Sequence, residues 1–288
     1  MDISILLLIH DVDYNHASIT AIALKQLIST LVDNENIEVI VVDNGSPYPK
    51  AISDISNICQ PRLTISRIKT NVGIVAGYNH AASLAQGKFM MVCHSDCVVS
   101  LKTIEGVYRC FLQNPDAGIV LSKLYSPRGN LLQSGGFISN NFHLAWYTDD
   151  PISDIDVDWG DFITVRKNLF DQYGGLDQRY GLGYFEFPDL CLGIKSLDYR
   201  VILAANTKVI HYQSQTANRV LREVRKQEII RTNLKKFQAK WMYRRNLLTK
   251  SPLRSQLNES NLGILSVKGE PEAHVNEFAS IDITVNPL

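Results

Sequence analysis

The sequence lacks the features that mark several specialised classes of protein. No apolar run approaches the ~20 residues that a membrane-spanning helix requires, so any contact with a membrane is expected to be peripheral. The 29 basic residues are balanced by 29 acidic ones, and no overall charge attracts the chain to nucleic acid. We therefore expect no nucleic-acid partner.

Cysteine is scarce and scattered. The chain has 5 cysteines, with no CxxC pair and no histidine spacing typical of structural zinc: Cys59, Cys93, Cys97, Cys110 and Cys191. This pattern predicts free thiols in a reducing cytoplasm. The N-terminus begins with Asp2 rather than basic residues, and its apolar run ends at His10, so it is interpreted as a buried strand and not as a signal peptide.

The composition is that of a folded globular protein. Hydrophobic residues make up 45% and charged residues 20% of the 288 positions. Apolar runs at 3–9, 38–42, 63–68 and 89–93 alternate with helical patterns at 18–32, 76–85 and 101–114, the first with Ser18 as a candidate N-cap. This order predicts an α/β fold with a mostly parallel central sheet, helices on both faces and ligands at the carboxyl ends of the strands.

Four segments are expected along the chain. Residues 1–100 are interpreted as a nucleotide-sugar-binding half and 101–215 as an irregular, acceptor-side half of the same domain. Strands are expected at 159–166, 201–205 and 208–211, and helices at 167–173 and after residue 189. Residues 216–250 form a basic amphipathic helical segment. Residues 251–288 form a polar tail.

The basic segment is open to two interpretations. Between Arg219 and Arg254 there are twelve basic residues and only two acids, Glu223 and Glu228, a net charge of +10. It is either a solvated surface helix with a buried apolar stripe, or a surface that docks on an anionic inner leaflet, where each basic residue contributes about 1 kcal/mol. Nucleic-acid binding finds no support in any recognised motif beside this charge.

Short motifs occur in a specific order along the chain. They are Val41-Val42-Asp43-Asn44-Gly45-Ser46, Asn71-Val72-Gly73, Gly77-Tyr78-Asn79, Gly174-Gly175-Leu176-Asp177 and Asp189-Leu190-Cys191-Leu192, with Asp96 and Glu186 at fixed places between them. From about Asp2 to Trp241 this order resembles family 2 glycosyltransferases of the GT-A fold, particularly bacterial rhamnosyltransferase-like members.

The resemblance implies an enzyme and a site. It implies an inverting, hexosyltransferase-type enzyme, in the cytoplasm or at the inner face of the membrane, that moves a sugar from a nucleoside-diphosphate sugar to a hydroxyl of a glycan or lipid-linked glycan in bacterial surface polysaccharide synthesis. Mn or Mg would neutralise the diphosphate, with Asp96 and His211 as metal ligands. The nucleotide-sugar site would comprise Asp43, Asn71, Gly73, Asn79, His94, Ser95 and Asp96.

Several of these residues also have structural interpretations. Asp96 could cap a helix, His211 could be a hydrogen-bonded residue at a strand end, and Asp43 could form a turn. On the acceptor side we expect Trp159, Asp161 and Tyr184, where the aromatic rings either stack on sugar or belong to the core.

Two positions depart from the family pattern. His94 stands where the first acid of an Asp-x-Asp motif is expected, and it either hydrogen-bonds ribose or phosphate or simply packs. Phe187 replaces the second of two adjacent acids, which is often the general base. Glu186 is therefore the first candidate for the base and Asp189 the second, unless Asp189 caps its helix.

These departures keep two other functions open. One is a catalytically degenerate GT-A protein that binds a nucleotide sugar without transferring it. The other is a sugar-nucleotide nucleotidyltransferase, which should have a Gly-rich, basic loop after its first strand. Residues 10–16 contain no such loop.

Overall fold

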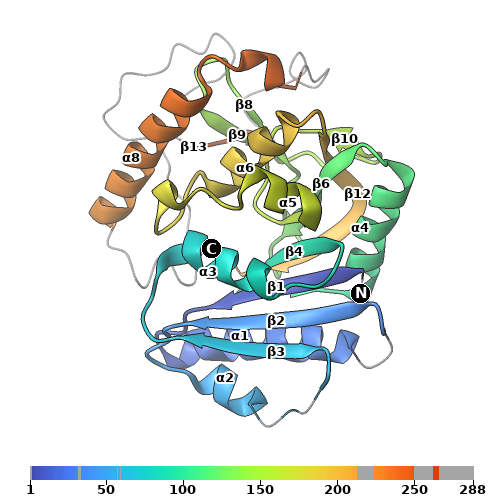
Figure 1. The fold of residues 1–288 in the computed structure, drawn as a ribbon, viewed down its shortest axis with the longest axis vertical. Coiled ribbons are helices and arrows are strands. Elements are labelled where there is room, and N and C mark those ends of the chain that lie inside the picture. The colour runs from blue at the N-terminus through green and yellow to red at the C-terminus, as the bar shows by residue number, and fades with distance from the viewer. Residues whose placement is uncertain are drawn as a thin grey trace.

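The computed structural model describes residues 2–31, 34–56, 58, 60–212, 223–249 and 262–265. Within them, a ten-stranded sheet runs through the molecule, and a second sheet of three strands lies beside it (Figure 1). The order in the large sheet is β10-β12-β6-β11-β4-β1-β2-β3, with β5 paired to β12 and β7 paired to β6.

The N-terminal half builds a parallel block. The strands β1 (Ile3–Ile9), β2 (Ile37–Asn44), β3 (Leu63–Ile68) and β4 (Phe89–His94) pair side by side in parallel, and all residues of β1 and β2 are buried. The connections contain α1 (Tyr14–Thr30), α2 (Lys50–Ile55) and α3 (Gly73–Leu84). This arrangement confirms the expected alternation of strands and helices, to which the structure adds α2.

The second half continues the same sheet with mixed strand directions. β6 (Ala117–Tyr125) and β12 (Arg200–His211) pair in parallel, whereas β11 (Ile163–Arg166) runs antiparallel between β4 and β6. The short strands β5 (Cys97–Val99), β7 (Leu131–Gln133) and β10 (Ile155–Asp156) are antiparallel to their neighbours. The small sheet contains β8 (Gly136–Ile138), β9 (Leu144–Tyr147) and β13 (Leu262–Leu265).

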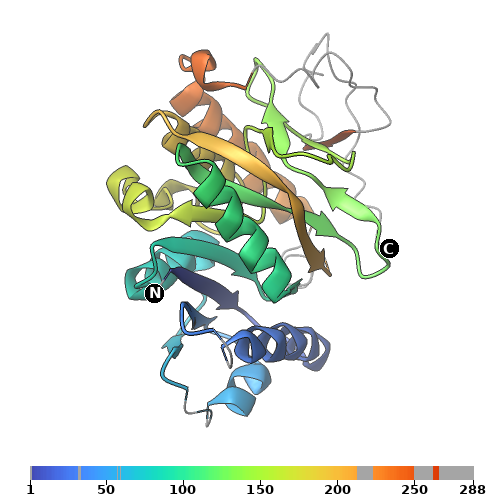
Figure 2. The same cartoon turned by 90° about the vertical axis from the view of Figure 1, so that its right-hand side faces the viewer.

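Helices cover both faces of the large sheet, as expected. Figure 2 looks onto the face covered by α1 and α4 (Leu101–Gln113), where the core includes Leu24, Leu27 and Phe111. The other face packs against α3, α5 (Lys167–Tyr173), α6 (Glu186–Lys195) and α8 (Glu223–Trp241). The single turns η1 (Gln178–Tyr180) and η2 (Arg245–Leu247) precede α6 and follow α8.

Two local expectations were wrong. Ser18 is not the cap of α1, because the helix starts four residues earlier, at Tyr14. Its cap is Asp13, which accepts a hydrogen bond from the His16 amide, while the Ser18 hydroxyl donates to the Tyr14 carbonyl. The predicted strands 201–205 and 208–211 are one strand, β12, whose register against β6 shifts between Ala204 and Val209. That irregularity explains why the pattern looked interrupted.

Within the described part of the basic segment, 223–249, residues 223–241 form α8, and a turn with the single turn η2 follows. α8 buries Ile230, Leu234, Phe237 and Trp241 against the body and exposes Arg225, Arg231 and Lys235. The flanks of this segment at 216–222 and 250, and the tail except 262–265, lie outside the described residues, and so does Cys59. Cys93, Cys97, Cys110 and Cys191 are free thiols, as predicted. Among the helices described, none has the length and apolar character of a membrane span.

Candidate active site

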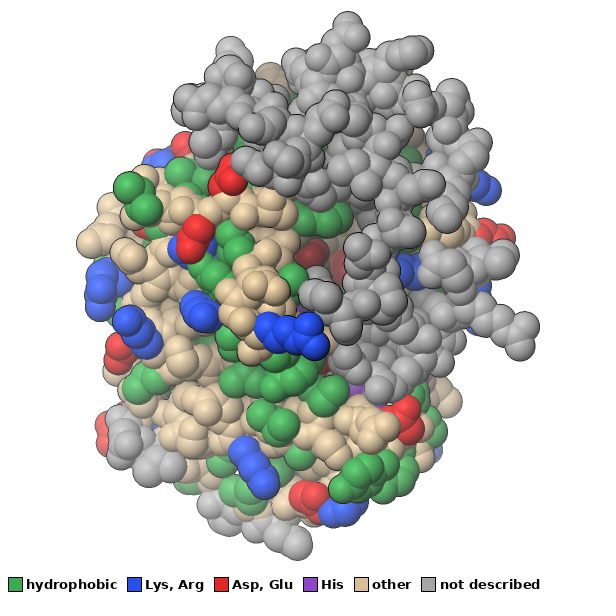
Figure 3. All heavy atoms as spheres, turned by 180° about the vertical axis from the view of Figure 1, so that it is seen from behind, with side chains coloured by type: hydrophobic (Ala, Val, Ile, Leu, Met, Phe, Trp, Pro, Cys, Tyr) green, Lys and Arg blue, Asp and Glu red, His purple; other side chains and the backbone are tan. Residues whose placement is uncertain are grey.

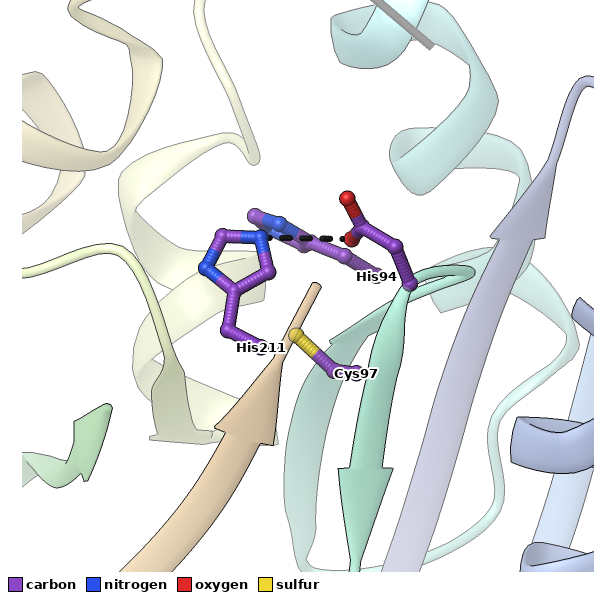
Figure 4. A group of neighbouring side chains, drawn as sticks. His94, Cys97 and His211 are labelled. Carbon is purple, nitrogen blue, oxygen red and sulfur yellow. Dashed lines mark ion pairs between the residues drawn. The ribbon is translucent and has the colours of Figure 1, made fainter. Parts of the chain in front are cut away.

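Four potential metal ligands converge where β4, β5 and β12 meet. Tight pairing of β12 with β5 sets His211 opposite Cys97, and the Tyr212 amide donates to the Asp96 carbonyl at 2.8 Å. One ligand atom from each of His94, Asp96, Cys97 and His211 lies within 4.8 Å of the others. In Figure 4 the two imidazole rings and the thiol approach one another from different strands. We call these four residues the His-Asp-Cys cluster.

The protonation of the two histidines differs. Burial, together with the neighbouring His211, lowers the pKa of His94 to about 4, so its imidazole is neutral near pH 7. Burial also acts to lower the pKa of His211, but Asp96, whose Oδ1 lies 3.3 Å from His211 Nε2, outweighs it and raises that pKa. Two imidazole nitrogens, a carboxylate oxygen and a thiol together fit a divalent cation, because each of these groups is a common metal ligand in proteins.

Aromatic rings enclose one side of the cluster. The Phe187 ring stacks on His94 with centroids 5.9 Å apart, and Tyr78 lies 6.1 Å from Phe187 and 6.3 Å from His94. Phe187 is buried and belongs to the core. The residue at the family's second acidic position therefore contributes an apolar wall and has no group that could accept a proton.

Glu186 and Asp161 place acidic groups beside the cluster. Burial raises the pKa of Glu186 to about 7, and the charge of Asp161 acts in the same direction. Burial raises the pKa of Asp161 too, against the charge of His211 and the Gln133 amide, whose Nε2 lies 3.3 Å from Asp161 Oδ2. Glu186 Oε2 is buried with no hydrogen-bond partner among the residues described. A carboxylate with one unpartnered oxygen and a pKa near neutrality has the properties of a general base.

The loop before Glu186 is held in an unusual conformation. Tyr184 and Phe185 have positive φ angles of 66° and 75°, which residues with side chains rarely adopt. Asn233 of α8 is buried, and its amide Nδ2 donates to the carbonyls of Tyr180 at 2.9 Å, Gly183 at 2.8 Å and Tyr184 at 3.3 Å. α8 therefore supports the loop that delivers Glu186. No sequence pattern indicated this role for Asn233, since it lies within a basic helix far along the chain.

The nucleotide-side residues meet at the carboxyl ends of β2 and β3. Asp43 is buried; its Oδ1 accepts from the Ser46 amide at 2.9 Å, and its Oδ2 lies 3.2 Å from the half-exposed Arg67 Nε. Asn44 donates to Asn71 Oδ1 at 3.1 Å and accepts from the Val72 amide at 2.9 Å. The Asn44 side chain thus fixes the turn that leads into α3.

Close backbone packing accounts for Gly73. Its φ is +87°, and a Cβ there would lie 2.6 Å from the carbonyl oxygen of Gly181. Gly73 therefore lets the start of α3 approach the loop that precedes Glu186. Asn79, also in α3, uses both ends of its amide on Leu176, donating to the carbonyl at 2.8 Å and accepting from the amide at 2.9 Å. Asn79 binds the turn after α5 to the body.

Two other predicted site residues are engaged in packing. Asp189 is fully buried and accepts four hydrogen bonds. The donors are Tyr173 Oη at 2.9 Å, Tyr180 Oη at 3.1 Å, Lys240 Nζ at 2.8 Å and Trp241 Nε1 at 2.8 Å. Trp159 is buried, and its indole donates to the carbonyls of Phe137 and Ala145. Tyr184 is half-buried and Ser95 is buried.

An acidic residue that sequence analysis did not single out lies at the end of β1. Asp11 is fully buried, accepts from Thr20 Oγ1 at 2.6 Å, and is close enough to Asp43 for their charges to interact. Burial raises its pKa to about 6. Its position just after an apolar strand was the signal available in the sequence.

Figure 3 shows that one face of the molecule is hollowed near its centre, with acidic side chains visible there.

A separate pocket lies on the α8 side of the same loop. It has a volume of about 290 Å³ and lies between residues 179–182 and α8, with Glu228, Thr232 and Lys236 on the helix side. It does not include the His-Asp-Cys cluster.

The α/β fold places candidate ligand residues near the carboxyl ends of its strands, and comparison with known proteins identifies both the fold and the family. GalNAc-T7, whose crystal structure contains UDP, GalNAc and Mn²⁺, superposes with a TM-score of 0.59 at 11% identity, over 73% of this chain and 44% of that one, which shows the GT-A fold. Residues 14–174, more than half of the chain, match the model of glycosyl transferase family 2, and the chain belongs to that family.

One curated relative matches over part of its length. It is the uncharacterized protein y4gI of Sinorhizobium fredii, 23% identical over 194 residues. The match covers 62% of this chain and 21% of the relative, so the chain spans about a fifth of that protein. The narrower resemblance to rhamnosyltransferase-like members stays a prediction.

Proposed function

We propose that the chain transfers a hexosyl group from a nucleoside-diphosphate sugar to a hydroxyl of a glycan or lipid-linked glycan, with inversion at the anomeric carbon. The acceptor oxygen attacks that carbon and loses its proton to Glu186. The bond from the anomeric carbon to the diphosphate oxygen breaks, and the diphosphate leaves with the bonding electrons. Bacterial surface polysaccharide synthesis is the proposed setting.

The observation that carries this proposal is the state of Glu186. A general base works best when its pKa lies near the working pH, and burial gives Glu186 a pKa of about 7 with one carboxylate oxygen unpartnered in the described structure. Asp189, the second candidate, already accepts four hydrogen bonds. These contacts favour Glu186 as the base and an anchoring role for Asp189.

The donor would bind across the carboxyl ends of β1, β2 and β4. Asp43 is proposed to read the nucleotide base by exchanging its contact with the half-exposed Arg67 for a ring N–H, and Asn71 to line the pocket. Asp96 and His211 are proposed to hold a divalent cation, which when bound neutralises charge on the diphosphate. Asp161 lies on the proposed acceptor side, beside Glu186.

A second candidate function is nucleotide-sugar binding without transfer. Phe187 favours it, because the residue at the family's second acidic position is packed against His94 and cannot accept a proton. The two functions differ in turnover: the first releases nucleoside diphosphate in the presence of acceptor or slowly to water, and the second releases none.

A peripheral position at the inner face of a membrane is also proposed. After α8, Met242 and Tyr243 are 41% and 85% exposed, and the exposed Arg244 and Arg245 follow them. Apolar and basic side chains together at one exposed site are the combination that binds anionic lipid surfaces. This position would bring the loop before Glu186 near a lipid-linked acceptor.

Thermal unfolding with a panel of nucleoside diphosphates, each with and without Mn²⁺, tests the donor site. We expect one nucleotide to raise the melting temperature in a metal-dependent way, because a ligand that binds only the folded state stabilises it. Asp96→Ala should abolish the shift, and the exposed Asp54→Ala in α2 should keep it. A wild-type protein that responds to no nucleotide would contradict the proposal.

A further inference from the structure

The His-Asp-Cys cluster differs in chemistry from a site made of carboxylates. Of its four candidate ligand atoms, two are imidazole nitrogens and one is a sulfur, which leaves Asp96 to supply the one carboxylate oxygen. Mg²⁺ binds oxygen ligands and water in a nearly regular octahedron, whereas imidazole and thiolate suit Zn²⁺ and its neighbours in the first transition row. The donor set therefore discriminates among cations.

Cys97 is placed to take part in this set by the strand pairing. It is the first residue of β5, opposite His211 on β12, and its side chain is 1% exposed. Figure 4 shows its sulfur on the same side as the His211 ring, between the two strands. Its position is fixed by the sheet, so no change of backbone is needed to bring it within reach of an ion held by His94 and His211.

We propose that Cys97 is a metal ligand and that the His-Asp-Cys cluster takes a Zn²⁺-like transition ion, such as Zn²⁺ or Co²⁺, in preference to Mg²⁺ and Mn²⁺. This inference rests on the metal site of the proposed function. It goes beyond that function in adding His94 and Cys97 to the ligands and in assigning the class of ion.

Charge balance supports the assignment. A buried ion is tolerated when opposite charges surround it, and one carboxylate with one thiolate neutralises a divalent cation. Coordination to a metal deprotonates a thiol outright, so Cys97 would supply that thiolate once an ion is bound.

The experiment is a titration of the chelator-treated full chain with Co²⁺ alone, followed by absorption spectroscopy. We expect saturation at one ion per chain and a sulfur-to-cobalt charge-transfer band in the near ultraviolet. Cys97→Ser should lose that band while keeping Co²⁺ binding through the other three ligands. Cys110→Ser, the same change at a buried cysteine on α4 whose thiol contacts Asp154 instead, should keep the band.

Competition completes the test. Zn²⁺ should displace Co²⁺ at concentrations at least roughly tenfold lower than Mn²⁺, and Mg²⁺ should displace it least, as expected for nitrogen and sulfur ligands. In Cys97→Ser, the concentrations of Zn²⁺ and of Mn²⁺ that displace Co²⁺ should be closer to each other. Cobalt bound without a charge-transfer band would overturn Cys97 as a ligand, and equal displacement by Mg²⁺ would overturn the preference.

These readouts need no sugar donor, so they separate this inference from the proposed function. A cluster that binds Co²⁺ through Cys97 in a chain without transfer activity supports the inference and contradicts the function. If Mg²⁺ supported transfer as well as Zn²⁺ did, and no sulfur-to-cobalt band appeared, the inference would be wrong and the function would stand.

Discussion

The ring of Phe187 stacks on the imidazole of His94, with the two centroids 5.9 Å apart and the planes inclined by 20°. Both residues stand where the resembled family has acids, and the two departures are in contact. Replacing two carboxyl groups by a stacked aromatic pair removes two like charges from a buried region, where their mutual repulsion would be strong. It also leaves Glu186, on α6, as the acid beside the His-Asp-Cys cluster that can accept a proton.

Activity should therefore follow the ionisation of Glu186. The base must be deprotonated, so we expect kcat to rise with pH through about 7 and to level off above it. Glu186→Gln should lower kcat by roughly 10²- to 10⁴-fold, the usual contribution of a general base, and leave nucleotide affinity close to that of the wild type. Steady-state kinetics between pH 5 and 9 make the measurement.

The matched control is Glu105→Gln, the same change at an exposed position of α4, which should keep the full pH profile. If Glu186→Gln retained wild-type kcat at pH 8, another group would have to be the base.

Stability should respond to pH in the opposite sense to activity. The pKa of Glu186 is raised on folding from 4.5 to about 7, so its neutral form is favoured in the folded state. That stabilisation is complete below pH 4.5 and is lost as the pH rises through about 7; a shift of this size corresponds to at most about 3 kcal/mol. Glu186→Gln should remove this dependence and melt at a higher temperature than the wild type at pH 8.

Asp11 provides a second test of the same effect. Its pKa is raised from 3.8 to about 6, mainly by burial, so Asp11→Asn should also gain stability relative to the wild type above pH 6. Scanning calorimetry at pH 5 and pH 8 measures both variants. If acidification from pH 8 to pH 5 did not raise the melting temperature of the wild type relative to that of either variant, the assignment would be wrong.

The parallel half of the fold could be predicted from the sequence because its inner strands β1 and β2 are buried along their whole length. β1 matches the expected range, since a continuous apolar run marks such a strand clearly. β3 also matches, although it lies at the end of the sheet and is partly exposed, because its apolar residues alternate with polar ones. β5, β7 and β10 contain two or three residues each, too few for a pattern. Helix starts were less certain because Ser, Asp and Asn all cap helices, and Asp13 rather than Ser18 is the cap of α1.

The candidate site was predictable where a residue lies near the carboxyl end of a strand, as Asp43 does in β2 and His94 in β4, or just past it, as Asp96 does. The pairing of Cys97 with His211 was not, because 113 residues separate them and their contact depends on the antiparallel register of β5 and β12. Asp189 shows the converse problem. Its position in a motif indicated chemistry, but its side-chain contacts come from η1, α5 and α8, which only the folded chain brings together.

Asp189 and Lys240 should be a major link between α8 and the rest of the domain. Asp189→Asn removes the charge that Lys240 faces at 2.8 Å and weakens the bonds from Tyr173 and Trp241. Lys240 keeps its second ion pair, with Asp177 Oδ2 at 2.9 Å, so the loss comes from the buried charge-assisted hydrogen bonds to Asp189. We expect a loss of about 2 kcal/mol in the free energy of unfolding, the usual value of a hydrogen bond to a charged group. Urea denaturation followed by tryptophan fluorescence measures it.

The control for that link is an ion pair of the same kind on the surface. Lys50 and Asp54 pair on α2 with both side chains about half exposed, so Asp54→Asn should change stability by less than about 1 kcal/mol. Equal effects of the two substitutions would show that the buried network does not hold α8.

Asn233 should act on catalysis as a positioning residue through the backbone of the loop before Glu186. Asn233→Ala removes the donor shared by the carbonyls of Tyr180, Gly183 and Tyr184, and leaving buried carbonyls unsatisfied costs about 1 to 3 kcal/mol. Without it, the positive φ angles of Tyr184 and Phe185 lose their support. We expect kcat to fall roughly tenfold or more with nucleotide affinity unchanged, because displaced catalytic groups lose reactivity while the donor pocket is built by other elements.

A purely structural role for Asn233 would lower stability alone, so the pH profile separates the two roles. A loop that relaxes exposes Glu186 to water, and its pKa then moves from about 7 back toward 4.5. The acid limb of kcat in Asn233→Ala should therefore shift to lower pH, whereas Asn246→Ala, an exposed asparagine just beyond α8, should leave the limb in place. A stable Asn233→Ala protein with the wild-type limb and wild-type kcat would mean that the loop holds Glu186 without help from α8.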